Sequence, residues 1–192
     1  TYVTYDPVSS PAAIITVGPG AGQPYITTMQ ETIPDFCADV TITSAANGNW
    51  NNPATWSLNR VPNATDIVRV QHTVTYDAGD GRADCVGMKD GGTLYFARTA
   101  TTKLTAGNIL VYSDGILDIG TTDAPITGKV DIVIADKPLN VDGSLPGRVD
   151  PEQFGTALIS LGKVRMHGKS MSHTFARTKQ VPTAGATQLV LD

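Results

Sequence analysis

Short apolar or alternating segments recur along the chain, and Gly, Asn, Asp and Pro residues separate them. Such alternation predicts β-strands, and the separating residues are typical of turns. Helical periodicity is nearly absent, because the one weak segment, Thr28 to Phe36, contains the helix breaker Pro34. The pattern predicts an all-β protein with strands at residues 13–17, 40–43, 66–70, 73–76, 93–96, 108–112, 116–119, 129–134, 157–161, 163–167 and 188–191.

A Gly-x-apolar pattern recurs from the middle of the chain onward. It begins at Gly92, Gly115, Gly143 and Gly162, with gaps of 23, 28 and 19 residues. Each coil of a parallel β-helix needs a turn, an inward apolar residue and a return, which takes roughly 20 residues, and glycine permits the tight turn. The pattern favours a right-handed parallel β-helix. A β-sandwich, whose strands recur every 8–12 residues or so, is the alternative.

The first 43 residues differ from the rest in composition. They contain five prolines and the stretch Gly-Pro-Gly-Ala-Gly at 18–22, which predicts an extended arm or cap, with the β-helix domain at 44–192. The arm's apolar segment, 13–17, is expected to pair either with its own β-helix or with the edge of a neighbouring copy. The terminal apolar segment suggests a chain cut from a longer polypeptide, and a natural terminal strand is the alternative.

Composition bounds the partners. Charged residues are 17% of the chain, the net charge is −4, and no Lys/Arg run occurs, so a nucleic-acid partner is not expected. No apolar run is long enough to span a bilayer, and neither a signal peptide nor an initiating Met is present, as in a mature product.

Two features bear on the compartment. Cys37 and Cys85 are the only cysteines, and an even pair in a chain of extracellular character predicts a disulfide, with two unrelated buried thiols as the alternative. Asn63-Ala64-Thr65 is an N-glycosylation sequon, which matters in a eukaryotic secretory pathway.

An ordered series of motifs runs through most of the chain. Gly48-x-Trp50, Pro-Ala-Thr-Trp at 53–56 and Val-Pro at 61–62 come first, and GGTLYF, GILDIGTTDAPI, GKVRMHGKSMSHTF and AGATQLVL follow. This order resembles the eight-glycine domain family over roughly residues 44–191. The resemblance implies an extracellular β-helix with a connection to polysaccharide, since some members are linked to hyaluronan breakdown. It transfers no catalytic residue.

Three acidic residues, Asp77, Asp80 and Asp84, lie with Gly79 and Gly81 in one predicted turn. Hard cations prefer several oxygen ligands on a flexible loop, so calcium is the metal this turn could hold. The spacing differs from that of the twelve-residue calcium loop, and a solvated acidic turn is the favoured interpretation. No other cofactor is predicted.

The densest polar cluster follows the last glycine motif, and its members are Arg165, His167, Lys169, His173 and Arg177. Cations and imidazoles could bind a polysaccharide, although a structural His167 is the competing interpretation. Asp114, Asp118 and Asp123 are interpreted as surface carboxylates, with Asp118 outward on a strand. Trp50 and Trp56 are interpreted as packing residues of a cap and, alternatively, as platforms for sugars.

The sequence thus predicts no catalytic residue and leaves three functions open. The first is an extracellular, non-catalytic module that binds or organises polysaccharide within a larger secreted protein. The second is a fragment of a hyaluronidase-like or lyase-like enzyme, and the third is a structural subunit of an extracellular fibre. The expected partners are polysaccharide or neighbouring subunits and domains.

Overall fold

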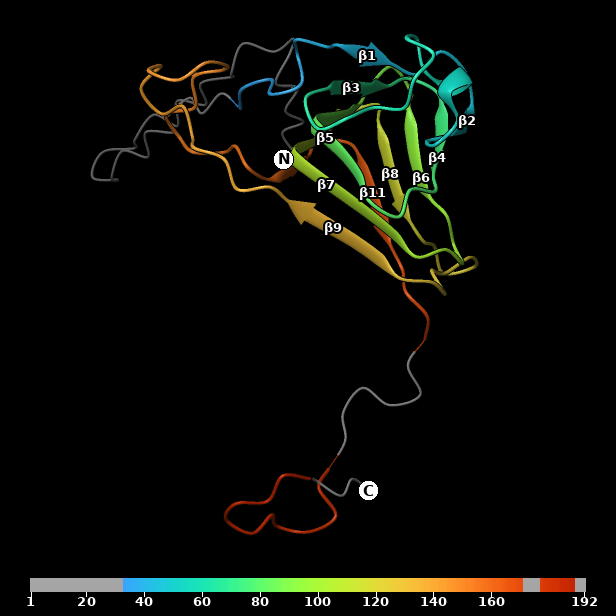
Figure 1. Cartoon of the computed structure of the whole chain (residues 1–192), viewed down its shortest axis with the longest axis vertical. Helices are drawn as coiled ribbons and strands as arrows, with labels where there is room; N and C mark the ends of the chain where they lie inside the picture. The colour runs from blue at the N-terminus through green and yellow to red at the C-terminus, as the bar shows by residue number, and fades with distance from the viewer. Residues whose placement is uncertain (1–32, 171–176, 189–192) are drawn as a thin grey trace, which may run out of the picture.

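The computed structural model describes residues 33–170 and 177–188, so the predicted strand at 13–17 and most of that at 188–191 lie outside the described residues. Within them, the regular secondary structure consists of β-strands and the short 3-10 turn η1 (Pro53–Thr55). The prediction of an all-β protein is confirmed. Figure 1 shows the strands arranged one after another from β1 and β2 at one end to β9 and β11 at the other.

The strands form two sheets, and the chain alternates between them from β1 to β9. The first sheet contains β1 (Ile42–Thr43), β3 (Ile67–Val70), β5 (Gly81–Met88), β7 (Thr102–Val111), β9 (Val130–Ile134) and β10 (Leu158–Ser160). The second sheet contains β2 (Gly48–Asn49), β4 (Thr73–Tyr76), β6 (Thr93–Phe96), β8 (Ile116–Ile119) and β11 (Lys163–Met166). Every ladder between these strands is parallel.

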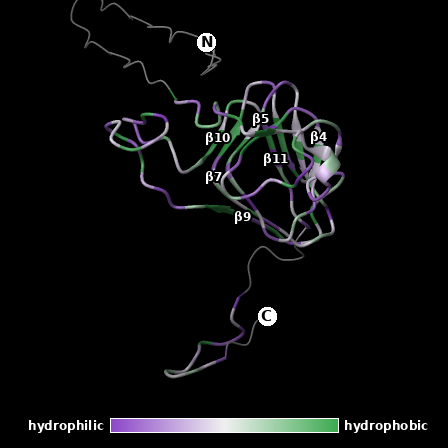
Figure 2. Cartoon of the chain, turned by 45° about the horizontal axis from the view of Figure 1, so that its top comes forward, coloured by the Kyte–Doolittle hydropathy of each residue, from purple (hydrophilic) through white to green (hydrophobic). Residues whose placement is uncertain are grey.

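The core lies on the face of each sheet where alternate apolar residues point. In the second sheet, Val74, Leu94 and Leu117 are paired in register and completely buried. Hydrophobic residues recur along the strands in Figure 2, whereas much of the hydrophilic colour lies in loops and turns. Apolar residues of successive strands therefore lie next to one another in rows, and the burial of these rows stabilises the fold.

An aromatic group closes the end at which β1 and β2 lie. The indoles of Trp50 and Trp56 are 4.9 Å apart, and the Trp50 ring also packs edge-on against Tyr76. The Trp56 indole N–H donates to the carbonyl oxygen of Trp50 at 2.8 Å. Both tryptophans are buried, so they pack as a cap and present no face to a sugar.

Glycines make the turns between the two sheets possible. A Cβ added at Gly92 would lie 1.9 Å from the Val70 carbonyl oxygen, and one at Gly115 would lie 2.1 Å from that of Met88. A Cβ added at Gly162 would likewise lie 2.0 Å from the carbonyl oxygen of Tyr112. The remaining glycine of the predicted repeat, Gly143, differs from these three. It occupies a left-handed turn (φ of 80°) in the loop between β9 and β10 and begins no strand.

The prediction of an acidic turn from Asp77 to Asp84 is wrong over part of its length. Residues 81–88 form β5, which pairs with β3 on one side and β7 on the other. Gly and Asp are poor strand formers, but ladder hydrogen bonds to two neighbours outweigh that local preference. The same applies to the first half of β7, which the sequence pattern did not predict.

The predicted disulfide is present between Cys37 and Cys85. It ties residues 33–40, here called the strap, to β5. The Tyr112 hydroxyl donates to Asp35 of the strap at 2.5 Å, and Arg148 contacts Asp39 at 3.2 Å. Burial, and then the neighbouring Asp35 carboxylate, raise the pKa of the Tyr112 phenol above its ordinary value.

Candidate functional site: the outer face of the second sheet

A row of polar side chains crosses the outer face of the second sheet. Thr75 pairs with Tyr95, Tyr95 with Asp118 and Asp118 with Arg165, so four neighbouring strands contribute one residue each. Their neighbours Leu94 and Leu117 point into the core, and alternation therefore places the row on the opposite face.

Asp118 is the centre of this row. Its Oδ1 accepts from Arg98 Nη2 at 2.6 Å and from the backbone N–H of Gly120 at 3.0 Å, and its Oδ2 lies 3.6 Å from Arg165 Nε. The expectation of a surface carboxylate is wrong, because Asp118 is only 5% exposed. It lies on the outer face as the alternation predicted, but two arginines from other segments cover it.

Arg98 joins the ring of Tyr95 to this carboxylate. Its guanidinium carbon lies 3.9 Å from the Tyr95 ring centroid, and its Nε donates to the Tyr95 hydroxyl at 2.7 Å. Two guanidinium groups therefore share the one carboxylate of Asp118. The Arg165 side chain, 43% exposed, is the one of the two that solvent reaches more readily.

A hollow of about 290 Å³ adjoins the row. Residues 120–123 and 165–167 line it, so Arg165 and His167 border the same space. The backbone of His167 also holds the chain in place, since its N–H donates to Ile119 and its carbonyl accepts from Ile126. His167 thus combines a structural backbone role with an exposed side chain.

The rest of the predicted carbohydrate cluster is only partly placed. Lys169 and Arg177 are exposed, and no contact in the described residues brings either of them into the hollow. His173 lies outside the described residues. The geometry therefore unites Arg165 and His167 with Asp123 and adds Tyr95, Arg98 and Asp118.

The three acidic residues that the sequence suggested as calcium ligands each bind a different group of the protein. Asp77 accepts from the backbone N–H of Asn51 at 3.0 Å, Asp80 contacts Lys103 at 3.0 Å, and Asp84 contacts Lys137. The Lys103 ammonium lowers the pKa of Asp80, and Arg82 adds to this effect. No cluster of three or more His, Cys, Asp or Glu residues suited to a metal occurs in 33–170 or 177–188.

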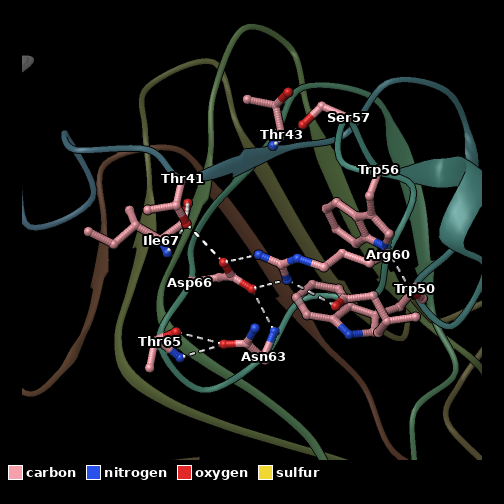
Figure 3. A network of polar contacts seen from close by, with 11 residues as sticks. Thr41, Thr43, Trp50, Trp56, Ser57, Arg60, Asn63, Thr65, Asp66 and Ile67 are labelled. Carbon is pink, nitrogen blue, oxygen red and sulfur yellow. Dashed lines mark hydrogen bonds and ion pairs between the residues drawn. The ribbon is translucent and has the colours of Figure 1, made fainter.

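The sequon lies in a loop held by a second ion pair (Figure 3). Arg60 donates to both oxygens of Asp66, at 2.6 and 2.7 Å, and Asp66 also accepts from Thr41 Oγ1 and from the backbone N–H of Asn63. The hydrogen bonds from Arg60 lower the pKa of Asp66 to about 2. Asn63, Ala64 and Thr65 are exposed above this buried carboxylate.

Comparison with known proteins identifies the family. Residues 55–179, more than half of the chain, match the model of the G8 domain. The chain belongs to the G8 domain family. This confirms the resemblance inferred from the ordered glycine motifs.

This G8 domain chain is also similar to mouse fibrocystin, with 34% identity over 87 residues. The match covers 44% of the chain and 2% of fibrocystin, so the chain spans a very small part of that relative. No solved structure is similar enough to the chain to count as a match. Among the described residues of this G8 domain chain, no helix has the length and hydropathy needed to cross a membrane.

Sequence reasoning missed Tyr95, Arg98, Arg60 and Asp66 as site residues. Tyr95 belongs to β6 and Arg98 follows it in this G8 domain, whereas Asp118 belongs to β8, and only the strand register brings them together. The one signal available was the alternation in 93–96, which places Tyr95 opposite Leu94 and Phe96.

Proposed function

We propose that this G8 domain is an extracellular, non-catalytic module of a larger protein, folded as a right-handed parallel β-helix, that binds polysaccharide on the outer face of its second sheet. The alternation of the chain between two parallel sheets supports the β-helix. Connections between parallel strands of one sheet are right-handed in about 98% of cases, which supports the handedness.

The disulfide and the relative support the setting. Disulfides persist in oxidising compartments, so the bond between Cys37 and Cys85 favours an extracellular location. In fibrocystin the matching segment is 2% of the whole, and a module of a larger protein is the arrangement that this resemblance favours.

The observation that carries the binding proposal is the row Tyr95–Asp118–Arg165 beside the hollow at His167. A polysaccharide is an extended chain of sugars that carry many hydroxyl groups. A sheet face with guanidinium, imidazole and phenol groups offers hydrogen-bond donors to such oxygens along one line. Arg165 presents several N–H groups in a fixed plane, which suits paired sugar oxygens or a carboxylate. The carboxylate of Asp118 keeps both arginine side chains in position.

The test is a screen of the pure chain against immobilised neutral and uronate-containing polysaccharides, followed by titration of the best ligand. Replacing Arg165 with Ala should weaken binding about tenfold, since a charged hydrogen bond contributes about 1.5 kcal/mol or more. Lys129→Ala is the matched control, because Lys129 is an exposed cation that contacts Asp131 of the first sheet. Equal affinity of the two variants, or no binding to any polysaccharide, would disprove the proposal.

A further inference from the structure

The loop at residues 61–66 exposes three residues between two buried ones. Pro62 and Asp66 are buried, whereas Asn63, Ala64 and Thr65 between them are exposed. These three residues form the only Asn-x-Ser/Thr sequence in the chain with a residue other than Pro at its middle position. The sequence thus offers one acceptor for an N-linked glycan, and the fold places it at the surface.

The Asn63 side chain has a fixed orientation. Its Oδ1 accepts from the Thr65 backbone N–H at 2.9 Å and from the Thr65 hydroxyl at 2.8 Å. Both hydrogen bonds engage the carbonyl end of the amide (Figure 3). In the part of the chain that the structure describes, no hydrogen bond occupies Nδ2, the atom to which a sugar is attached.

The loop keeps its shape without help from that nitrogen atom. The Asn63 backbone N–H donates to Asp66 at 2.7 Å, and Arg60 holds the same carboxylate through two hydrogen bonds. A substituent on Nδ2 would break none of these contacts. A hollow of about 290 Å³, lined by residues 61–64 and 78–82 among others, lies beside the loop and leaves room for a sugar.

From this geometry we infer that Asn63 is an N-glycosylation site that receives a lipid-linked oligosaccharide when the chain passes through a eukaryotic secretory pathway. The transfer breaks the bond between C1 of the first sugar and the lipid pyrophosphate and forms a bond from C1 to Asn63 Nδ2. It releases the lipid pyrophosphate and one proton. The disulfide between Cys37 and Cys85 forms under the same oxidising conditions.

The glycan lies on a loop that is separate from the proposed polysaccharide face. The loop precedes β3 of the first sheet, whereas the row from Tyr95 to Arg165 belongs to the second sheet. The inference is therefore independent of the proposed function, and polysaccharide binding is expected to be the same with and without the glycan.

The test is secretion of the full chain from mammalian cells behind a cleavable signal sequence. The intact mass is measured before and after treatment with peptide N-glycosidase, and the tryptic peptide of residues 61–69 is sequenced. We expect one glycan on most molecules and conversion of Asn63 to Asp on its removal. Asn63→Gln and Thr65→Ala should abolish the glycan, and Thr65→Ser, which retains the hydroxyl, should keep it.

Secreted wild-type chain with the Cys37–Cys85 bond formed but without sugar on the 61–69 peptide would overturn the inference. So would a glycan that persists on Asn63→Gln. Because the wild-type peptide reports occupancy directly, the test holds even if a variant fails to be secreted.

Discussion

The Asp66 carboxylate joins two segments of the chain, its own loop at residues 60–66 and the residue before β1. Arg60 and Asn63 belong to the loop before β3, and Thr41 immediately precedes β1. The carboxylate is 3% exposed, and each of its oxygens accepts at least two hydrogen bonds. A buried carboxylate with such partners stabilises the fold in its ionised form, and the folded protein therefore holds the pKa low.

Asp66→Asn should lower the free energy of unfolding at pH 7 by about 2 kcal/mol, because the ordinary pKa of 3.8 falls to about 2 in the folded chain. A lowered folded pKa means that this stability is complete above pH 4 or so and is lost as the pH falls toward 2. Urea denaturation of both proteins between pH 2 and 7 measures the difference. The curves should converge at the acid end, and the exposed Asp123→Asn control should change by less than about 0.5 kcal/mol.

Residue-level prediction from sequence succeeded where a side chain depends on its own strand. Alternation placed Asp118 on an outer face, and the tendency of large aromatic side chains to be buried predicted the packing of Trp50 and Trp56. It failed where the partner comes from a distant part of the sequence. The sequence near Asp118 does not indicate that Arg98 is its partner, because their contact depends on the pairing of Tyr95 with Asp118 in a parallel ladder.

Glycine turns are the structural elements that set how closely neighbouring parallel strands approach one another. At Gly115 the nearest atoms to an added Cβ are the carbonyl oxygen and carbon of Met88, at 2.1 and 2.8 Å. Backbone atoms of a neighbouring strand cannot move aside without breaking their ladder. Any side chain at this position would therefore push the turn at Gly115 away from β5.

Gly115→Ala should lower the free energy of unfolding by about 2 kcal/mol or more, which is the upper part of the range for overpacking. It should also broaden the unfolding transition. Gly79→Ala is the matched control, because no atom lies within 4 Å of its added Cβ and its backbone is not left-handed. Thermal unfolding followed by circular dichroism compares the two. Equal melting temperatures would show that the stack yields at its turns.

The element pattern was predictable where a strand lies between apolar alternation and a turn. Strands β3, β4, β6, β8 and β11 were predicted within one residue of their observed bounds. β5 was not, since the segment Gly81 to Met88 contains Asp84 and two glycines and resembles a loop. Its strand conformation depends on β3 and β7 on either side, which a local pattern does not contain.

At the scale of the molecule, the two ends of the stack differ. Buried Trp50 and Trp56 close the end at β1, whereas at the other end Met166 of β11 is 58% exposed and Val133 of β9 is 39% exposed. The strap reinforces the middle of the stack. Cys37 packs beside Gly87 of β5 and the Tyr112 ring, so the strap covers the outer face of the first sheet.

The disulfide should contribute about 4 kcal/mol to the stability of the whole chain, since it links residues 48 apart and removes that loop's freedom from the unfolded state. The double variant Cys37→Ala/Cys85→Ala should unfold at a correspondingly lower urea concentration, and dithiothreitol should lower the wild-type midpoint without affecting the variant. Loss of the strap should also expose the Tyr112 ring and end its hydrogen bond to Asp35, so the tyrosine absorbance should titrate nearer to its ordinary pKa of about 10 in the variant. If the variant retains wild-type stability and the wild-type Tyr112 titration, then the contacts of Asp35 and Arg148 hold the strap without the covalent bond.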